Sequence, residues 1–132
     1  MATARGDRGQ STVEFALVLP LVVLFALFVV QAGFVVRDQL LVSHAAREAA
    51  RAAAVSDADR AGAALLAARR AGGLDPDRLS GAVTPVDGGA GVRVSISYRS
   101  PTDLALVGML VPDVDLDAAV VMRVESVRKD RS

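Results

Sequence analysis

The longest apolar run of the chain is Phe15–Val36, and its one strongly polar residue is Gln31. Glu14 precedes this run, and Arg37 follows it. As a helix with a rise of about 1.5 Å per residue, such a run is roughly 33 Å long, which is enough to cross the hydrocarbon core of a bilayer. The pattern therefore predicts one transmembrane helix, to which we assign residues 10–36.

Helical periodicity continues beyond the membrane run. No helix breaker stands between Arg37 and Val55, so we expect the membrane helix to continue outward as one rod. Small and apolar residues recur on one side of this rod at helical spacing, which allows close packing. The positions of this stripe are Leu41, Ala45, Ala49 and Ala52.

A second helix is predicted from about Asp57 to Ala71. Ser56 is its expected N-cap, because its side chain can accept a hydrogen bond from the first turn. Leu65 and Leu66 are expected on its apolar face, and Gly72-Gly73 is expected to end it. Two helices joined near Ser56 predict a bend where the rod meets the rest of the exported domain.

From Leu79 onward the apolar period changes to two, which is typical of half-buried strands. Leu79–Val86 is predicted as an edge strand because it contains Gly81 and Pro85. A glycine-rich turn at residues 87–91 leads into a strand over Val92–Arg99, and a last strand alternates in the same way. The residues expected to face inward are Val92, Val94, Ile96, Tyr98, Val114, Leu116, Ala118, Val120, Met122 and Val124. A loop or short helix between these two strands carries Leu104, Leu106, Met109 and Leu110.

These elements predict an α+β chain. A long N-terminal transmembrane helix continues into a small exported domain with a second helix and an antiparallel sheet of about three strands. We divide the chain into a leader at residues 1–9, a transmembrane helix at 10–36, an extracytoplasmic helical stalk at 37–73, a small sheet domain at 74–126 and a basic tail at 127–132.

The charges that flank the span predict its orientation. Arg5 and Arg8 make the leader positive, whereas Arg37 on the other side is balanced by Asp38. Positive charge favours the cytoplasmic side, so we expect the N-terminus inside and the C-terminal domain outside. The run fits either a retained single-span anchor or a secretory signal that is cleaved near Ala32.

The residues that open the span suggest a third possibility. Gly9 followed five residues later by Glu14, at the mouth of an apolar helix, resembles the processing site of type IV prepilins. In that family a prepilin peptidase cuts after the glycine, which implies a cut between Gly9 and Gln10 here. The resemblance also implies that Glu14 pairs with the freed amino terminus of Gln10 in a neighbouring subunit. Pro20 would accompany a locally loosened helix, as prolines near this depth do in pilins.

The segment Ala45–Arg51, AAREAAR, resembles the segment that follows the membrane helix in TadE-like proteins, which are pilins of the tight-adherence system. With the prepilin pattern, this resemblance implies a type IVb pilin-like minor pilin or pseudopilin that takes part in assembly of a tight-adherence (Flp-type) pilus used for adhesion. The implied partners are membrane lipid, a prepilin peptidase, other pilins and the pilus assembly platform. The implied location is the cytoplasmic membrane, with incorporation into a surface pilus.

An alternative from a different class remains open. The chain could be a plain membrane-anchored or signal-peptide-secreted envelope module that binds a protein partner without polymerising. A prepilin peptidase gene or a secretion ATPase gene next to this one would favour the pilin.

Composition argues against several other functions. With 15 basic and 15 acidic residues the net charge is zero, so nothing favours a nucleic-acid partner. Cysteine is absent and His44 is the one histidine, so we expect no metal site and no cysteine–histidine catalytic pair. Asp113, Asp115 and Asp117 do not begin an EF-hand loop, because Ala118 stands where that loop needs glycine. We therefore expect no catalytic residue, no cofactor and no small-molecule substrate, and an envelope enzyme is the least favoured alternative.

Overall fold

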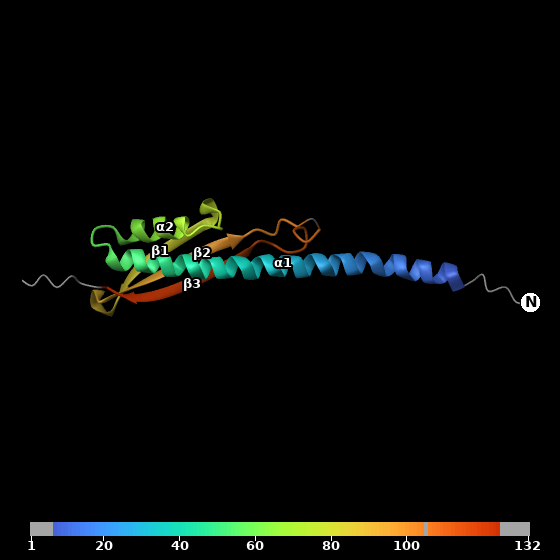
Figure 1. The fold of residues 1–132 in the computed structure, drawn as a ribbon, viewed down its shortest axis with the longest axis horizontal. Helices are drawn as coiled ribbons and strands as arrows, with labels where there is room; N and C mark the ends of the chain where they lie inside the picture. The colour runs from blue at the N-terminus through green and yellow to red at the C-terminus, as the bar shows by residue number, and fades with distance from the viewer. Residues whose placement is uncertain (1–6, 105, 125–132) are drawn as a thin grey trace, which may run out of the picture.

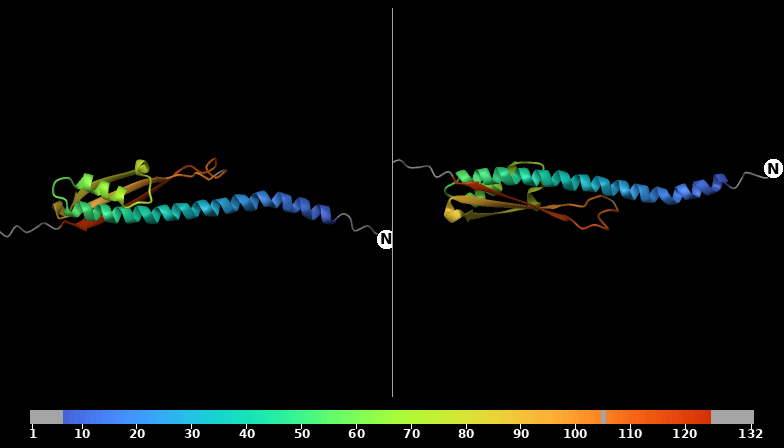
Figure 2. Two further views of the ribbon diagram at one scale, coloured as in Figure 1. Left: turned by 45° about the horizontal axis from the view of Figure 1, so that its top comes forward. Right: turned by 90° about the horizontal axis from the view of Figure 1, so that it is seen from below.

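The computed structural model describes residues 7–104 and 106–124. It is dominated by one helix, α1 (Asp7–Val55), which is 49 residues long and contains Pro20. Figure 1 shows that the N-terminal half of α1 projects alone beyond the rest of the molecule. In Figure 2, α1 changes direction within its blue segment, the part that contains Pro20, as expected for a proline that removes a helical hydrogen bond.

The two halves of α1 differ in what surrounds them. In the N-terminal half, large apolar side chains are exposed, among them Phe15 at 67%, Leu17 at 74% and Phe25 at 68%. In the C-terminal half, Val42 and most of the alanines that follow it are buried. Within the described residues, α1 is the one helix long and apolar enough to cross a membrane. The predicted long apolar helix that continues as one rod into the small domain is therefore confirmed as a structural element.

The C-terminal half of α1 carries a small domain, which we call the head (residues 60–104 and 106–124). It contains the helix α2 (Arg60–Arg70) and a three-stranded antiparallel sheet in the order β1-β2-β3. The strands are β1 (Leu79–Val86), β2 (Gly91–Ser100) and β3 (Val114–Arg123). Two short 3-10 turns, Pro76–Arg78 and Asp87–Gly89, precede and follow β1. The predicted α+β fold is confirmed.

Strand alternation places one face of the sheet against the helices. Val94 of β2 pairs with Val83 of β1 and with Val120 of β3. On this inner face α1 packs against β2 and β3, while α2 packs against β1 and α1. The helices and the sheet therefore form two layers, with the helices covering one face of the sheet, as both Figure 1 and Figure 2 show. The expected edge position of β1 is confirmed, because among the strands of residues 7–104 and 106–124 only β2 pairs with it.

The core lies between these two layers and is built from small residues on the helices. Its buried members are Val42, Ala45, Ala46, Ala49, Ala50, Ala53, Ala54, Ala64, Ala68, Leu79, Val92, Val94, Ile96, Tyr98 and Leu116. Alanine has a short side chain, so α1 can lie close to both α2 and the sheet. The larger β-branched and aromatic side chains of β2 then fill the space that remains.

The start of α2 differs from the expectation. The helix begins at Arg60, and its N-cap is Asp59, whose Oδ1 accepts a hydrogen bond from the backbone N–H of Gly62 at 2.8 Å. The prediction of a cap at Ser56 and a start at Asp57 was wrong, because residues 56–59 form the connection that reverses the chain. Leu66 was also placed wrongly, since it is 50% exposed.

The end of α2 agrees with the expectation. Gly72 and Gly73 both have positive φ angles, of 80° and 81°, which end the helix in a conformation that other residues adopt reluctantly. The basic tail at residues 127–132, Glu125, and residues 1–6 of the leader lie outside the described residues.

Candidate functional site: the N-terminal helix and its junction with the head

The expected processing site lies in the first turn of α1. The backbone of Gly9 and Gln10 is helical, two and three residues after the helix begins at Asp7. Helix ends fray, and glycine weakens a helix by about 1 kcal/mol relative to alanine, so this turn is the easiest part of α1 to open.

Glu14 lies one turn further on and meets Gln10. The Gln10 side-chain amide donates a hydrogen bond to Oε1 of Glu14 at 3.4 Å, between two exposed residues. This distance is at the long limit for such a bond, so the contact is weak and easily exchanged. The four ion pairs found within the described part of the chain all lie at or beyond Arg37. Glu14 is thus an exposed acid with a weak neutral partner at the start of an apolar helix.

A second set of polar contacts joins α1 to the head, and we call it the junction (Gln31, Asp38, Ser100 and Pro101). Gln31 is 6% exposed, and its amide donates to the carbonyl oxygen of Pro101 at 3.3 Å. Asp38 is 7% exposed and accepts a hydrogen bond from the Ser100 hydroxyl at 2.8 Å. Arg37 also pairs with Asp38, at 3.1 Å. Because buried polar groups are costly without partners, these bonds fix where the head sits along α1.

The junction was missed in the sequence, although a signal was present. Gln31 was read as an isolated polar residue of the span, and Asp38 as a charge that closes it. The two residues are seven apart, which is about two helical turns, so they lie on the same face of α1. Ser100 extends the inward alternation of β2 by one step beyond Tyr98. That the polar face of α1 meets the end of β2 is a tertiary contact, which neither the helical spacing nor the strand alternation predicts by itself.

The stripe of small residues on α1 lies within the molecule. Ala45 and Ala49 are 1% and 0% exposed and belong to the core, whereas Leu41 and Ala52 are half-buried. Leu41 lies over Gly73 at the end of α2, where an added Cβ would come within 3.0 Å of its Cδ1 atom. The stripe therefore lets the head approach α1 closely.

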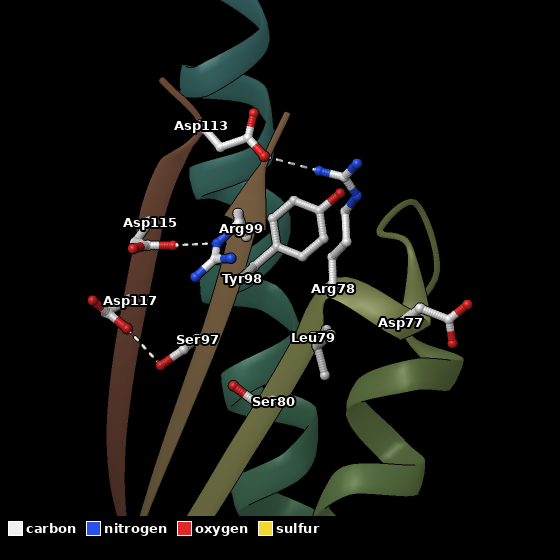
Figure 3. A pocket seen from close by; sticks show the side chains of 10 residues that line it. All are labelled: Asp77, Arg78, Leu79, Ser80, Ser97, Tyr98, Arg99, Asp113, Asp115 and Asp117. Carbon is white, nitrogen blue, oxygen red and sulfur yellow. Dashed lines mark hydrogen bonds and ion pairs between the residues drawn. The ribbon is translucent and has the colours of Figure 1, made fainter. Parts of the chain in front are cut away.

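The outer face of the sheet has a hollow of about 670 Å³ near β1 and the 3-10 turn before it. Figure 3 shows that the three aspartates from β3 and the residue before it, Asp113, Asp115 and Asp117, turn to separate partners. Asp113 pairs with Arg78 at 3.3 Å, and Asp115 pairs with Arg99 at 3.2 Å. Asp117 accepts a hydrogen bond from the Ser97 hydroxyl. Exposed pairs of this kind contribute little stability, so this face is a hydrated, ion-paired surface.

The comparisons with known proteins concern α1. Residues 9–51 match the family model described as TadE-like protein. No curated protein and no solved structure was found to match the chain. The matched segment starts at Gly9, contains the exposed apolar half of α1 and the α1 side of the junction, and ends in the alanine-rich part that packs on the head. The resemblance drawn from the residues is confirmed here: the segment from Gly9 to Arg51 is TadE-like.

Proposed function

We propose that this protein is a minor pilin or pseudopilin that takes part in assembly of a tight-adherence (Flp-type) pilus. The observation that carries the proposal is the form of α1, a continuous TadE-like helix with an exposed apolar half and a half that carries the head. A filament built by lateral packing of such helices needs an apolar half that packs against neighbouring subunits and a second half that carries the head on the filament surface. The role is structural, with no catalytic step.

The apolar half of α1 needs a cover. Each large apolar side chain that moves from water into an apolar environment contributes about 1.5–3 kcal/mol, and this half exposes many of them. Lipid supplies the cover while the subunit is anchored in the cytoplasmic membrane, with its N-terminus inside and its head outside. In a pilus, the same surface would be covered by the helices of other pilins on the assembly platform.

Processing by a prepilin peptidase would change the chemistry at Glu14. A cut after Gly9 leaves a charged amine on Gln10, one helical turn from the Glu14 carboxylate. In a filament that excludes water and lipid, an unpaired carboxylate is strongly disfavoured, so Glu14 needs such a cation. The weak contact between Gln10 and Glu14 leaves the acid available for the amine of a neighbouring subunit. Glu14 would thereby set the register between subunits.

The alternatives differ in where the chain is cut. A secretory cut near Ala32 would remove Gln31, whose amide holds Pro101, and would divide α1 inside a continuous helix. This argues for retention of the helix. A plain anchored module that binds an envelope partner would keep its leader and would not polymerise.

The test is the intact mass of the protein purified from its native membrane. We expect a chain that begins at Gln10, and we expect Gly9→Val to retain the first nine residues. Gly33→Val is the matched control, because Gly33 is also in α1 and nothing lies within 4 Å of an added Cβ. This variant should be processed like the wild type. An uncut wild-type chain would instead support the plain anchored module, and a start near Gly33 would mean secretion.

A further inference from the structure

The connection between β2 and β3 has an unusual composition. From Leu104 to Pro112, nine consecutive residues carry no charged side chain and no side chain that can donate a hydrogen bond. Asp103 and Asp113 flank this stretch. Three large apolar side chains are strongly exposed: Leu106 at 57%, Met109 at 86% and Leu110 at 65%. Connections in water are normally rich in polar residues, so a cluster like this marks a contact surface. We call residues 101–104 and 106–113 the apolar loop.

The backbone of the apolar loop is bonded within the loop. The N–H of Gly108 donates to the carbonyl oxygen of Leu104 at 3.0 Å, and the N–H groups of Leu110 and Val111 donate to that of Val107 at 2.9 and 2.8 Å. In lipid each unsatisfied backbone group costs several kcal/mol, and irregular backbone is not exposed to lipid in the hydrocarbon core. These three bonds satisfy part of the loop's backbone, which suits the loop to the headgroup boundary, where water reaches the remaining groups.

The base of the loop is closed by polar contacts. The Thr102 N–H donates to Asp113 at 3.1 Å, and the Thr102 hydroxyl donates to the Pro112 carbonyl oxygen, also at 3.1 Å. Gly108 fits against Thr102, because a Cβ at this position would collide with the Thr102 carbonyl oxygen. The exposed apolar tip is therefore held by hydrogen bonds at its base, and the nearest charged residues, Asp103 and Asp113, lie at that base.

The junction places this loop beside the apolar part of α1. Pro101, at the base of the loop, is bonded to Gln31, which lies five residues inside the end of the apolar run at Val36. At the rise of an α-helix, five residues correspond to about 8 Å. Figures 1 and 2 show that the orange loop runs from the sheet along α1 toward its N-terminal end. The tip is therefore level with side chains of α1 that face the bilayer when α1 spans it.

We propose that the tip of the apolar loop lies at the headgroup boundary of the outer leaflet beside α1, with the side chains of Leu106, Met109 and Leu110 inserted among the acyl chains. This inference rests on the anchoring part of the proposed function. The occupant of the surface is lipid, because the loop continues the apolar surface of the span at the same height. The protein would then contact the membrane at two places, through the span and through the loop.

The absence of native cysteine allows a direct test. Met109→Cys and Leu110→Cys are prepared in the full chain, labelled with a thiol-reactive fluorophore and reconstituted into vesicles of phosphatidylcholine and phosphatidylglycerol. Quenching by nitroxide-bearing phosphatidylcholine reports contact with lipid, and quenching by aqueous iodide reports contact with water. We expect lipid quenching at both positions to approach that of Phe25→Cys in the span, with weak quenching by iodide.

The matched control is Ala90→Cys, an exposed site in the turn before β2, at the opposite end of that strand from the loop. Its label should be quenched by iodide, with lipid quenching several-fold below that at Met109. If Phe25 is quenched by lipid while Met109 and Leu110 behave like Ala90, the loop proposal is wrong and the anchor stands. If Phe25 itself is not quenched by lipid, anchoring fails and the loop proposal fails with it. Energy transfer between Met109 labels that rises with protein density, without lipid quenching, would show that a second copy occupies the loop instead.

Discussion

Single side chains decide where the head is attached to α1. Asp38 and Ser100 form the most enclosed polar contact of the described chain: both are buried, and the Ser100 hydroxyl donates to the Asp38 carboxylate. Hydrogen bonds to charged groups contribute more than neutral ones, about 1.5–3 kcal/mol when both partners are buried. The contact joins α1 to the end of β2, so its loss should weaken the packing of the sheet on the helix.

We expect Ser100→Ala to lower the free energy of unfolding of the head by about 1–3 kcal/mol, because Asp38 keeps Arg37 but loses its buried donor. Urea unfolding in detergent, followed by circular dichroism and by the Tyr98 signal, measures the change. Ser95→Ala is the control, since Ser95 is half-buried on the opposite face of the same strand. Equal effects from both variants would contradict a specific role for the Asp38 contact.

At the scale of elements, the strands could be predicted better than the second helix. The bounds of β1 agreed with Leu79–Val86, because the Gly72-Gly73 and Pro76 breakers before it and the glycine-rich turn after it limit the strand on both sides. The start of α2 was missed because Ser56 and Asp59 are both good N-caps. The choice between them depends on how many residues the chain needs to reverse and pack α2 against β1, which local sequence does not contain. Leu66 was misplaced for the same reason, since rotation of α2 follows from its start.

The alanine-rich half of α1 leads to a prediction about packing. Ala49→Leu adds three carbon atoms at a position that is 0% exposed, so it should separate α1 from the head. Overpacking of this kind costs about 1–3 kcal/mol, and more where the backbone cannot move. The thermal midpoint of the near-ultraviolet signal should fall. Ala61→Leu, at an exposed position of α2, should leave it nearly unchanged. A stable Ala49→Leu protein would mean that the layers adjust easily.

At the scale of the whole molecule, the sequence divided the chain at residue 36, between membrane and exported parts. That boundary stays a prediction; the structure shows that the head contacts α1 as far as Gln31, inside the segment assigned to the membrane. The contact point lies inside the predicted span because the base of the apolar loop pairs with α1 at Gln31. The position of the head along α1 is set by the junction, and no local sequence pattern contains it. The overall plan of a long helix with a sheet packed on its outer half was predictable, because each element carried its own periodicity.

Assembly is also a property of the whole molecule, and Glu14 tests it. If Glu14 is buried against an amine in the filament, Glu14→Ala removes one partner of a buried pair, which costs about 3–5 kcal/mol. We expect incorporation into pili to fall at least roughly tenfold while membrane insertion continues, as measured by immunoblotting of sheared surface fractions and of membranes. Glu48→Ala changes another acid of the same helix and should assemble normally. Normal piliation by the Glu14 variant would favour the plain anchored module.

The continuity of α1 has a mechanical consequence. Between Pro20 and Val55 the helix contains no further proline and no interruption, so the outer half is a rigid lever attached to the span. Its length from residue 37 to residue 55 is about 27 Å. A transmembrane helix tilts by about 20° to fit bilayers of different thickness, and at that tilt the far end of the lever moves sideways by roughly 9 Å. Membrane thickness would in this way change the sideways position of the β1–β2 turn relative to the axis perpendicular to the bilayer.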